Sequence, residues 1–493
     1  MNNPLFEALF ATGAAGAPAL EAEDRGYSYS ELDQETARYA NALSELDVQP
    51  GDRVAVQAAK STANLIAYLA IVRAGAAIVP LNTAYTLAEL DYFIADAEPS
   101  LIIVDPERDP GIAARAPRVR IATPATLSAL ARGASPAFET APRAESDLAA
   151  LCYTSGTTGR SKGAMLTHGA LTANARALVA AWRFTPADIL IHALPIFHVH
   201  GLFIATHVPL MAGASILLQP RFDAGAVIAA MDRASVLMGV PTFYVRLLAQ
   251  EGLTREAAAG MRLFVSGSAP LLASTHEAFA ARTGKAILER YGMSETLMNT
   301  SNPYVGRRVA GSVGSPLPGV ELRIVDEAGN LASEGLAGAV EIKGGNGFGG
   351  YWRAPDKTRA AFTADGWFRT GDVGHLDAEG YLHLAGRASD LIISGGLNVY
   401  PAEVEAAIDA VSGVIESAVI GLPNADLGEA VTAVVVAEEG EGRPSEARIV
   451  TEISERLAAF KRPKRVIFVD ALPRNAMGKV EKARLRRTCA PGN

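Results

Sequence analysis

Short apolar runs alternate with segments of helical periodicity through the first three quarters of the sequence. Between several of these runs lie alanine- and leucine-rich segments, such as residues 63–73 and 171–182. This alternation is typical of α/β folds with largely parallel sheets, in which ligands bind beyond the carboxyl ends of the strands. The sequence therefore predicts a large α/β domain of mainly parallel sheets flanked by helices. The strand-like runs include residues 54–56, 101–104, 189–191, 215–218, 236–240 and 262–265. The runs that end at Ile191, Val265 and Leu288 lead into small or polar residues, which are expected to face one crevice.

One apolar run, residues 148–152, leads directly into the sequence YTSGTTGRSKG at residues 153–163. Glycines allow several backbone N–H groups to point at one spot, hydroxyls add donors, and such a nest suits a polyphosphate. Lys162 adds a mobile positive charge. The spacing is not that of a Walker loop. A solvated loop would have the same composition, but the position directly after a strand favours phosphate binding.

The composition excludes several classes of protein. The formal net charge of the 493 residues is −8, so no basic surface for nucleic acid is expected. The two cysteines, Cys152 and Cys489, lie far apart, which argues against a disulfide framework and fits a reducing cytosol. The first residues lack the basic start of a secretory signal, and the longest apolar region, residues 65–80, is interrupted by Arg73. We therefore expect a cytoplasmic protein with no membrane or nucleic-acid partner.

The pattern changes after residues 386–390. Short strand-like runs at residues 391–394, 417–421, 431–436 and 465–469 then alternate with two helical segments. One helix is expected to begin at Pro401, because proline is favoured at the first helical position, and the other to cover residues 445–460. The sequence therefore predicts an N-terminal domain at residues 1–388 and a small, mobile α+β C-terminal lid domain at residues 389–493.

The sequence contains five short motifs, at residues 153–163, 291–296, 369–372, 386–387 and 473–479. Together they resemble those of the adenylate-forming superfamily, which comprises acyl-coenzyme A synthetases, luciferases and the adenylation domains of peptide synthetases. They occur in the order that the family has and span nearly the whole chain, which makes the resemblance specific. Residues 81–86, 237–244, 298–303 and Arg246 look most like those of malonyl-coenzyme A synthetases within the superfamily.

The resemblance implies that the chain joins malonate to coenzyme A. In such a reaction the carboxylate attacks the α-phosphorus of ATP, and the thiol then displaces AMP from the acyl-adenylate. ATP, Mg²⁺ and coenzyme A are the implied cofactor and co-substrates. A ligase for methylmalonate or another short-chain acid remains an alternative, and an inactive nucleotide-binding sensor is an alternative from a different class. A peptide-synthetase module is disfavoured, because no carrier-domain serine motif follows in the sequence.

The resemblance also assigns roles to individual residues. Glu295 is expected to bind Mg²⁺ together with Thr154, and Lys479 to bridge the entering carboxylate and the α-phosphate. Asp372 and Arg387 are expected to hold the ribose hydroxyls. The full set expected to bind ATP or AMP is Thr154, Ser155, Gly156, Thr157, Thr158, Gly159, Arg160, Ser161, Lys162, Ser266, Gly267, Ser268, Ala269, Glu289, Arg290, Tyr291, Gly292, Met293, Ser294, Thr296, Asp372 and Arg387.

Each of these residues also has a plain structural interpretation when it is taken alone. Asp372 could close a turn, Glu295 could cap a helix, and Lys479 could be a solvated lysine in a basic tail. Their joint occurrence in the order of the family favours the functional interpretation. Relatives often carry Asp or Lys two residues after the arginine that matches Arg387, as a pivot between two domain orientations, whereas this chain has Ser389.

Selection of the acid depends on a second positive anchor, because a buried carboxylate without a partner costs several kcal/mol. Arg246 is the first candidate for that anchor and Arg308 the second, although Arg246 could also be a surface residue of a helix. His198 is expected to line the acyl pocket and act in catalysis, next to Met298. Metal binding by His198 and His200 is not expected, because further ligands do not gather nearby.

The resemblance finally suggests a macromolecular partner. Lys479 lies in a motif at which related synthetases are silenced by acetylation, and acetylation removes a positive charge. A lysine acetyltransferase and a deacetylase that act on Lys479 are therefore the expected protein partners.

Overall fold

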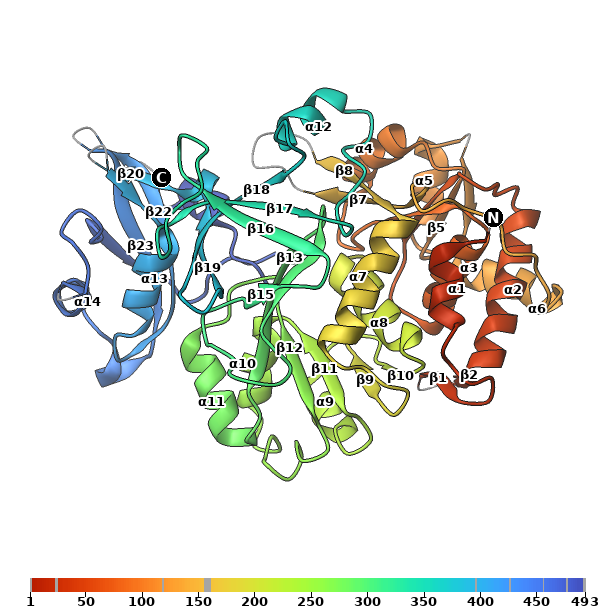
Figure 1. Cartoon of the computed structure of the whole chain (residues 1–493), viewed down its shortest axis with the longest axis horizontal. Coiled ribbons are helices and arrows are strands. Elements are labelled where there is room, and N and C mark those ends of the chain that lie inside the picture. Colours follow the sequence, from red (N-terminus) through yellow and green to blue (C-terminus); the bar gives the residue numbers. More distant parts are fainter. Residues whose placement is uncertain are drawn as a thin grey trace.

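The computed structural model describes residues 2–22, 25–117, 119–154, 161–394, 397–424, 427–454, 456–475 and 478–490. Among these residues the strands form four sheets (Figure 1). Two large sheets with mainly parallel strands make up most of the N-terminal part, and a four-stranded antiparallel sheet follows them in the sequence. A mixed sheet lies in the C-terminal part. The expected α/β fold with a small α+β C-terminal domain is thus confirmed.

The first large sheet has six strands in the order β6-β5-β3-β4-β7-β8, and only β7 and β8 pair in antiparallel fashion. In this last pair Thr154 lies opposite Lys162, so the described residues on either side of the middle of the glycine-rich motif pair with each other. Residues 155–160, the middle of the motif, lie outside the described residues. The strands are β3 (Arg53–Gln57), β4 (Ala77–Pro80), β5 (Leu101–Val104), β6 (Arg120–Ala122), β7 (Leu148–Thr154) and β8 (Lys162–Thr167).

The second large sheet has nine strands in the order β15-β14-β13-β12-β11-β9-β10-β1-β2, with parallel pairing from β1 to β13 along this order. The carboxyl ends of β9, β12 and β13 carry the polar residues that the sequence predicts to face a ligand. The strands are β1 (Pro18–Glu21), β2 (Gly26–Ser28), β9 (Ile189–His192), β10 (Ser215–Leu218), β11 (Val236–Gly239), β12 (Leu263–Ser266), β13 (Ile287–Met293), β14 (Leu297–Ser301) and β15 (Ser315–Pro316).

The two smaller sheets lie toward the C-terminus. The four-stranded sheet runs β16-β17-β18-β19, and the C-terminal sheet runs β21-β20-β23-β22 with β24 beside β23. The strands are β16 (Val320–Val325), β17 (Gly338–Gly344), β18 (Phe368–Leu376), β19 (Leu382–Arg387), β20 (Ile392–Ser394), β21 (Leu397–Val399), β22 (Val414–Asn424), β23 (Gly428–Ala437) and β24 (Arg465–Phe468).

The helices cover the faces of these sheets, and several begin at a capping side chain that satisfies a free backbone N–H. Ser28 and Glu31 form a capping box at α2, and the Thr167 side chain caps α7. Helix α7 contacts both β8 and β14 and so joins the two large sheets. The helices are α1 (Pro4–Phe10), α2 (Tyr29–Glu45), α3 (Thr62–Arg73), α4 (Leu87–Ala97), α5 (Asp109–Arg115), α6 (Pro124–Gly133), α7 (His168–Ala181), the π-helix η1 (His200–Ile204), α8 (Ala205–Met211), α9 (Ala224–Ala230), α10 (Pro241–Leu248), α11 (Ala273–Thr283), α12 (Pro355–Ala361), η2 (Ala388–Asp390), α13 (Pro401–Asp409), η3 (Gly440–Gly442), α14 (Glu446–Ile453) and α15 (Lys482–Thr488).

Two elements differ from the sequence-based expectation. The strand expected to end at Leu288 continues as β13 to Met293, because β14 pairs with its second half. The helix expected over residues 445–460 ends at Ile453. There the Ser454 hydroxyl donates to the Thr451 carbonyl at 2.6 Å, and such local bonds of serine compete with helix continuation.

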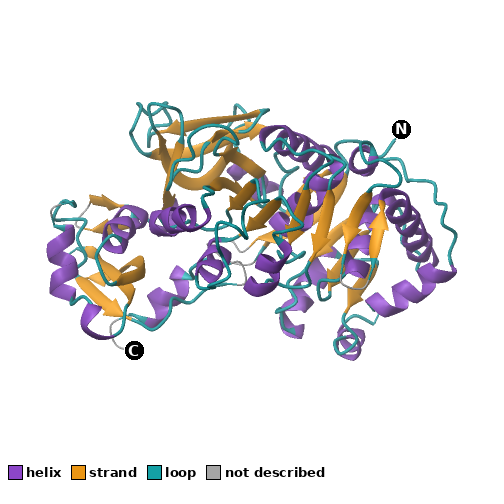
Figure 2. Ribbon diagram, turned by 90° about the horizontal axis from the view of Figure 1, so that it is seen from below, coloured by secondary structure: helices purple, strands orange, loops and turns teal. Residues whose placement is uncertain are grey.

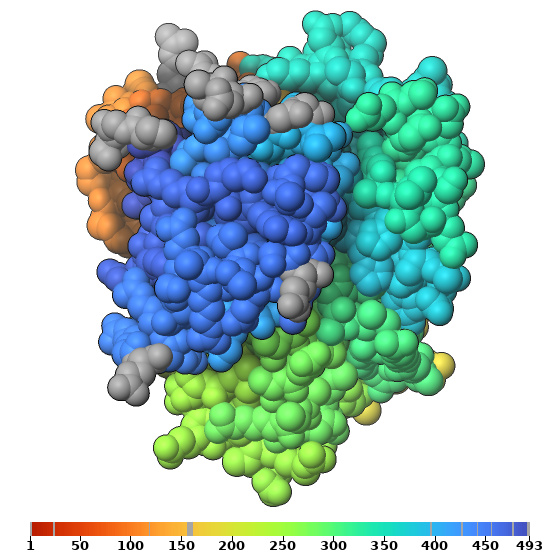
Figure 3. All heavy atoms as spheres, turned by 90° about the vertical axis from the view of Figure 1, so that its left-hand side faces the viewer, coloured from red at the N-terminus to blue at the C-terminus, as the bar shows by residue number. Residues whose placement is uncertain are grey.

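The molecule is elongated, with its C-terminal domain at one end and the N-terminus toward the other (Figures 1 and 2). In the space-filling view the C-terminal domain, coloured blue, packs on the green segment that contains α10 and α11 and on the cyan segment beside it (Figure 3). No helix among the described residues is long and apolar enough to cross a membrane.

Candidate active site

Side chains from two of the motifs meet Tyr351 where the end of β7 pairs with the start of β8. The Thr154 hydroxyl lies 3.3 Å from Oε1 of Glu295 and donates to it. Glu295 is buried in the turn between β13 and β14. Lys162 begins β8 and places its Nζ 4.9 Å from the centroid of the Tyr351 ring. The Tyr351 hydroxyl in turn donates to Oε1 of Glu295 at 3.1 Å.

The donors around Glu295 suit Mg²⁺. A buried carboxylate and the Thr154 hydroxyl are hard oxygen ligands, and Mg²⁺ in nucleotide sites is usually held by one or two carboxylates together with the phosphates of the substrate. In the part of the chain that the structure describes, no group of three or more His, Cys, Asp or Glu side chains is arranged to hold a metal. Glu295 and Thr154 would therefore hold Mg²⁺ jointly with a bound nucleotide.

Asp372 and Arg387 lie opposite each other on the neighbouring strands β18 and β19. Nε of Arg387 is 2.8 Å from Oδ1 of Asp372, and the Tyr291 hydroxyl donates to Oδ2 of the same carboxylate. Burial raises the pKa of Asp372, and the positive charge of Arg387 opposes that rise. The structure thus brings together a carboxylate and a guanidinium that can accept from and donate to a sugar diol.

Lys479 lies in a tight hairpin of the C-terminal domain. The Asn475 N–H donates to the Lys479 carbonyl at 2.9 Å, and the Glu481 N–H donates to the Pro473 carbonyl at 2.8 Å. The Arg474 guanidinium closes this hairpin from within, because it donates to the Gly478 carbonyl at 2.6 Å. The backbone that carries Lys479 is therefore held by several local bonds.

The charges of Asp372 and Arg387 act on the ammonium group of Lys479. Partial desolvation and then the charge of Arg387 lower its pKa, while Asp372 acts in the opposite direction. Both members of the Asp372–Arg387 pair thus influence a lysine that lies far from them in the sequence. Asp390, next to Ser389 at the expected pivot, forms an ion pair with Arg486 at 2.9 Å.

The loop after β12 approaches β13 very closely. A Cβ on Gly267 would lie 2.4 Å from Cζ of Arg290, so only glycine allows the guanidinium to pack there. Ser268 adopts a φ of +73°, and its hydroxyl lies 3.5 Å from Nδ1 of His200. On the other side of β13, the Gly311 N–H donates to Glu289 at 3.2 Å, and burial raises the pKa of Glu289 to about 8.

Arg290 is the buried cation of this region. Its Nε and Nη2 have no hydrogen-bond partner among the described residues, and burial lowers its pKa to about 9. His198 lies near it, and burial together with the charge of Arg290 lowers the pKa of His198 to about 4. The pKa of His200 is lowered for the same reasons. The neutral His198 and His200 therefore lie near a buried guanidinium that has no ion-pair partner among the described residues.

The structure places the predicted acid-binding residues differently from one another. Arg246 is exposed on α10. Arg308 donates to the carbonyls of Ala286 at 2.5 Å, Tyr304 at 3.1 Å and Pro303 at 3.3 Å, which occupies its guanidinium. Met298 is buried in the apolar core of the second large sheet. Of the arginines considered, Arg290, which the sequence assigned to the nucleotide, is the one with free donors beside His198.

The remaining motif residues shape the backbone around the site. A Cβ on Gly292 would lie 2.0 Å from the Leu297 carbonyl oxygen, so glycine permits the close pairing of β13 with β14. Thr296 is fully buried, and the Ser161 carbonyl accepts from the Tyr92 hydroxyl at 2.6 Å. Ala269 lies in the loop after β12, Met293 ends β13, and Ser294 lies in the turn that leads to β14. The predicted Ser155, Gly156, Thr157, Thr158, Gly159 and Arg160 lie outside the described residues.

Tyr351 was missed by the sequence analysis. It belongs to the sequence GGYW at residues 349–352, where an aromatic pair follows two glycines. That pattern was the available signal, but it does not reveal which side chains the ring contacts.

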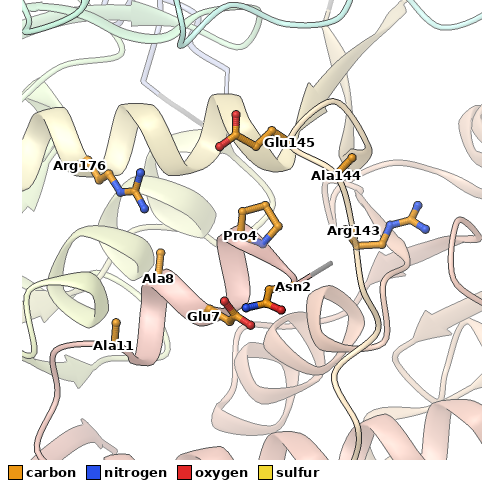
Figure 4. A pocket seen from close by; sticks show the side chains of 9 residues that line it. All are labelled: Asn2, Pro4, Glu7, Ala8, Ala11, Arg143, Ala144, Glu145 and Arg176. Carbon is orange, nitrogen blue, oxygen red and sulfur yellow. The ribbon is translucent and has the colours of Figure 1, made fainter.

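A surface hollow of about 510 Å³ lies elsewhere, between α1, α7 and the segment before β7 (Figure 4). Its walls carry both charges, from Glu7, Arg143, Glu145 and Arg176. None of the predicted site residues lines it.

Two family models match different parts of the chain. Residues 8–352 match the model of the AMP-binding enzyme family, and residues 403–479 match that of the AMP-binding enzyme C-terminal domain. The chain belongs to the AMP-binding enzyme family. It is therefore an adenylate-forming enzyme, as the five motifs predicted.

Relatives within this family carry names with different acids. The chain is 33% identical to the malonate–CoA ligase of Arabidopsis thaliana, over 98% of this chain and 88% of the relative. It is 36% identical to a feruloyl-CoA synthase of an Amycolatopsis species, over 93% of both chains. Membership of the family therefore does not by itself determine which acid the enzyme activates.

The crystal structure of ATP-bound MatB from Rhodopseudomonas palustris is 54% identical and covers 99% of both chains, with a TM-score of 0.96. The apo structure of the same protein gives a TM-score of 0.87 at the same identity. The overall structure of the chain thus resembles the ATP-bound form more than the apo form.

Proposed function

We propose that this protein ligates malonate to coenzyme A at the expense of ATP, through a malonyl-adenylate, and releases AMP and pyrophosphate. It is an AMP-forming acid–thiol ligase. The observation that carries the choice of acid is the buried Arg290, whose free donors lie beside the neutral His198. The distal carboxylate of malonate would supply the negative partner that this guanidinium lacks. The likeness to the malonate–CoA ligase of Arabidopsis thaliana supports the same choice.

In the first half-reaction, a carboxylate oxygen of malonate attacks the α-phosphorus of ATP, and pyrophosphate leaves. Negative charge accumulates during this step, so catalysis depends on position and electrostatics. Asp372 and Arg387 would hold the ribose, and Lys162 would contact the phosphate chain. Lys479 would neutralise the carboxylate and the α-phosphate as they approach. Mg²⁺ held by Glu295 and Thr154 would add charge neutralisation at the phosphates.

In the second half-reaction, the thiol of coenzyme A attacks the acyl carbon and AMP leaves. We propose a domain boundary at residues 388–389, about which the C-terminal domain, at residues 389–493, would turn to withdraw Lys479 from the site. The short η2 segment at this point and the better agreement with the ATP-bound form support an arrangement suited to adenylation.

Two alternatives remain distinct from this proposal. A ligase for methylmalonate or another short-chain acid would use the same adenylation chemistry with a different partner for Arg290. An inactive nucleotide sensor would bind ATP without carboxylate-dependent release of pyrophosphate. The presence of Lys162, Glu295 and Asp372 in one cluster favours an active enzyme.

The test is coenzyme A-dependent formation of AMP with malonate, methylmalonate, succinate, acetate and octanoate. We expect the highest kcat/KM with malonate. A higher value with acetate or octanoate would overturn the assignment of the acid, and ATP binding without AMP formation for any acid would favour the sensor.

Lys479 is also the proposed site at which acetylation regulates the enzyme. An acetyltransferase would reach Lys479 because the residue is exposed in its hairpin, and acetylation would remove the charge needed for adenylation. Mass spectrometry of Lys479 after treatment with an active acetyltransferase, together with the activity of the acetylated form, tests this. A cytoplasmic location is consistent with the unpaired Cys152 and Cys489.

A further inference from the structure

We propose that Tyr351 is a positioning residue that holds Glu295 and Lys162 in their working geometry for the Mg²⁺–ATP complex. This inference rests on the proposed adenylation chemistry and adds a residue that none of the five motifs contains. Tyr351 contacts both partners, with its hydroxyl 3.1 Å from Oε1 of Glu295 and its ring centroid 4.9 Å from Nζ of Lys162.

The backbone around Tyr351 is tied to both of the elements that carry these partners. The Phe348 N–H donates to the Glu295 carbonyl at 2.8 Å, and the Trp352 N–H donates to the Gly163 carbonyl at 2.8 Å. The Tyr351 N–H donates to the Thr358 hydroxyl at 2.8 Å. The segment therefore spans the distance between the metal-binding carboxylate and the strand that begins with Lys162.

Packing also holds the side chain of Tyr351 in place. Only 8% of the residue is exposed, and its ring packs edge-on against Phe348 with a centroid distance of 4.9 Å. Because the ring cannot move far, its hydroxyl and its face stay aimed at fixed points. A tyrosine in this place can orient a carboxylate and a lysine at the same time.

Each contact has a separate physical effect. The hydroxyl donates to Oε1 of the buried Glu295 carboxylate and so helps to fix the orientation of that group. Hydrogen bonds to charged groups are among the stronger ones in proteins. The electron-rich face of the ring attracts the ammonium group and limits where Lys162 can go. Loss of the hydroxyl should therefore affect the metal-dependent part of ATP binding, and loss of the ring should affect the metal-independent part as well.

Two variants separate these effects from simple packing. Tyr351→Phe keeps the ring and removes only the hydroxyl, whereas Tyr351→Leu removes both contacts. The matched control is Tyr39→Phe, because Tyr39 is 5% exposed and its hydroxyl lies 2.7 Å from the Ser128 hydroxyl, in the packing of α2 against α6. Thermal unfolding of each variant reports on packing alone.

The decisive measurement is the dissociation constant of ATP by calorimetry, with Mg²⁺ and with EDTA. For Tyr351→Phe we expect about a tenfold loss of the affinity that Mg²⁺ adds, and little change in EDTA. For Tyr351→Leu we expect the affinity for ATP to fall by a further factor of about three, and this loss should also be measured in EDTA. Tyr39→Phe should match the wild type in both conditions.

Three outcomes would overturn the inference: an unchanged effect of Mg²⁺ in Tyr351→Phe, an equal loss of affinity with and without the metal, or the same change in Tyr39→Phe. Thioester formation from supplied malonyl-adenylate should be retained in Tyr351→Phe, because the β- and γ-phosphates have already left as pyrophosphate before that step. Failure of the wild type to form AMP with malonate would refute the proposed function instead, and the calorimetric comparison is independent of it.

Discussion

Gly478 of the C-terminal domain lies directly against Thr242 at the start of α10 in the N-terminal domain. A Cβ on Gly478 would lie 3.1 Å from the Thr242 hydroxyl oxygen, and Gly478 itself has a φ of +75°. Because Gly478 precedes Lys479, the space that this glycine leaves allows the lysine hairpin to come close to the nucleotide site. The proposed rotation of the C-terminal domain would break this contact.

Substitution of Gly478 by alanine should therefore slow adenylation. The methyl group meets Thr242, and an L-residue at positive φ adds strain of about 1–3 kcal/mol, so we expect at least a tenfold slower release of pyrophosphate. Thioester formation from malonyl-adenylate should change much less. Gly440→Ala is the matched control, because Gly440 has a φ of +82° in the same domain but nothing within 4 Å of its Cβ position. Equal losses in both half-reactions would contradict the proposed role of the contact.

Lys479→Ala tests the division of labour between the two half-reactions. Loss of a preorganised positive group should cost about 2.7–4 kcal/mol in the adenylation step, which corresponds to about a hundredfold to a thousandfold slower reaction. Single-turnover measurements with ATP and malonate, compared with supplied malonyl-adenylate and coenzyme A, separate the steps. Lys464→Ala, an exposed lysine of the same domain, should leave both rates unchanged. Domain alternation would be refuted if Lys479→Ala slowed thioester formation as much as adenylation.

Much of the fold could be predicted from the sequence, because the alternation of apolar runs and helical segments is a local property. The strand that leads into the glycine-rich motif was predicted in the same way, whereas its antiparallel partner β8 was not. Contacts between distant parts were not. The bond from Tyr351 to Glu295 joins residues that lie 56 positions apart, and its existence depends on the pairing of several strands.

The orientation of Arg290 could not be predicted for a more specific reason. The apolar pattern predicts a strand that ends at Leu288, and side-chain directions cannot be inferred beyond the end of a strand. In the structure β13 includes Glu289, Arg290 and Tyr291, and side chains in a strand alternate between its two faces. Tyr291 accordingly faces Asp372, while Arg290 faces Gly267 on the other side.

The elevated pKa of Glu289, about 8, predicts how stability depends on pH. The folded state holds a proton on Glu289 between its ordinary pKa of 4.5 and about 8, and the unfolded state does not. The contribution of Glu289 to the free energy of unfolding is thus fully present below pH 4.5, and it is lost as the pH rises toward 8. Glu289→Gln mimics the neutral form, so it should raise the melting temperature relative to the wild type more at pH 7.5 than at pH 5.5. The expected gain at the higher pH is on the order of 3 kcal/mol. A gain that does not depend on pH, measured by thermal unfolding at both values, would show that Glu289 is not the titrating group.

Arg290 and Arg246 can be tested against each other as anchors for the distal carboxylate of malonate. Arg290 is buried with free donors beside His198, whereas Arg246 is exposed on α10. Removal of the partner of a buried charge costs about 2–5 kcal/mol, so Arg290→Ala should lower kcat/KM for malonate by about thirtyfold or more. Acetate has no second carboxylate, so its kcat/KM should fall far less and could rise.

The same measurements on Arg246→Ala provide the comparison. We expect its ratio of kcat/KM for malonate to that for acetate to stay close to the wild-type ratio, because an exposed guanidinium cannot compensate a desolvated charge. Arg290→Lys should recover part of the activity with malonate, since it restores the charge without the bidentate geometry of arginine. A selective loss of malonate activity in Arg246→Ala, with Arg290→Ala affecting both acids equally, would assign the anchor to Arg246. A parallel fall for both acids in both variants would instead point to a defect in folding or nucleotide binding, and it would refute both assignments.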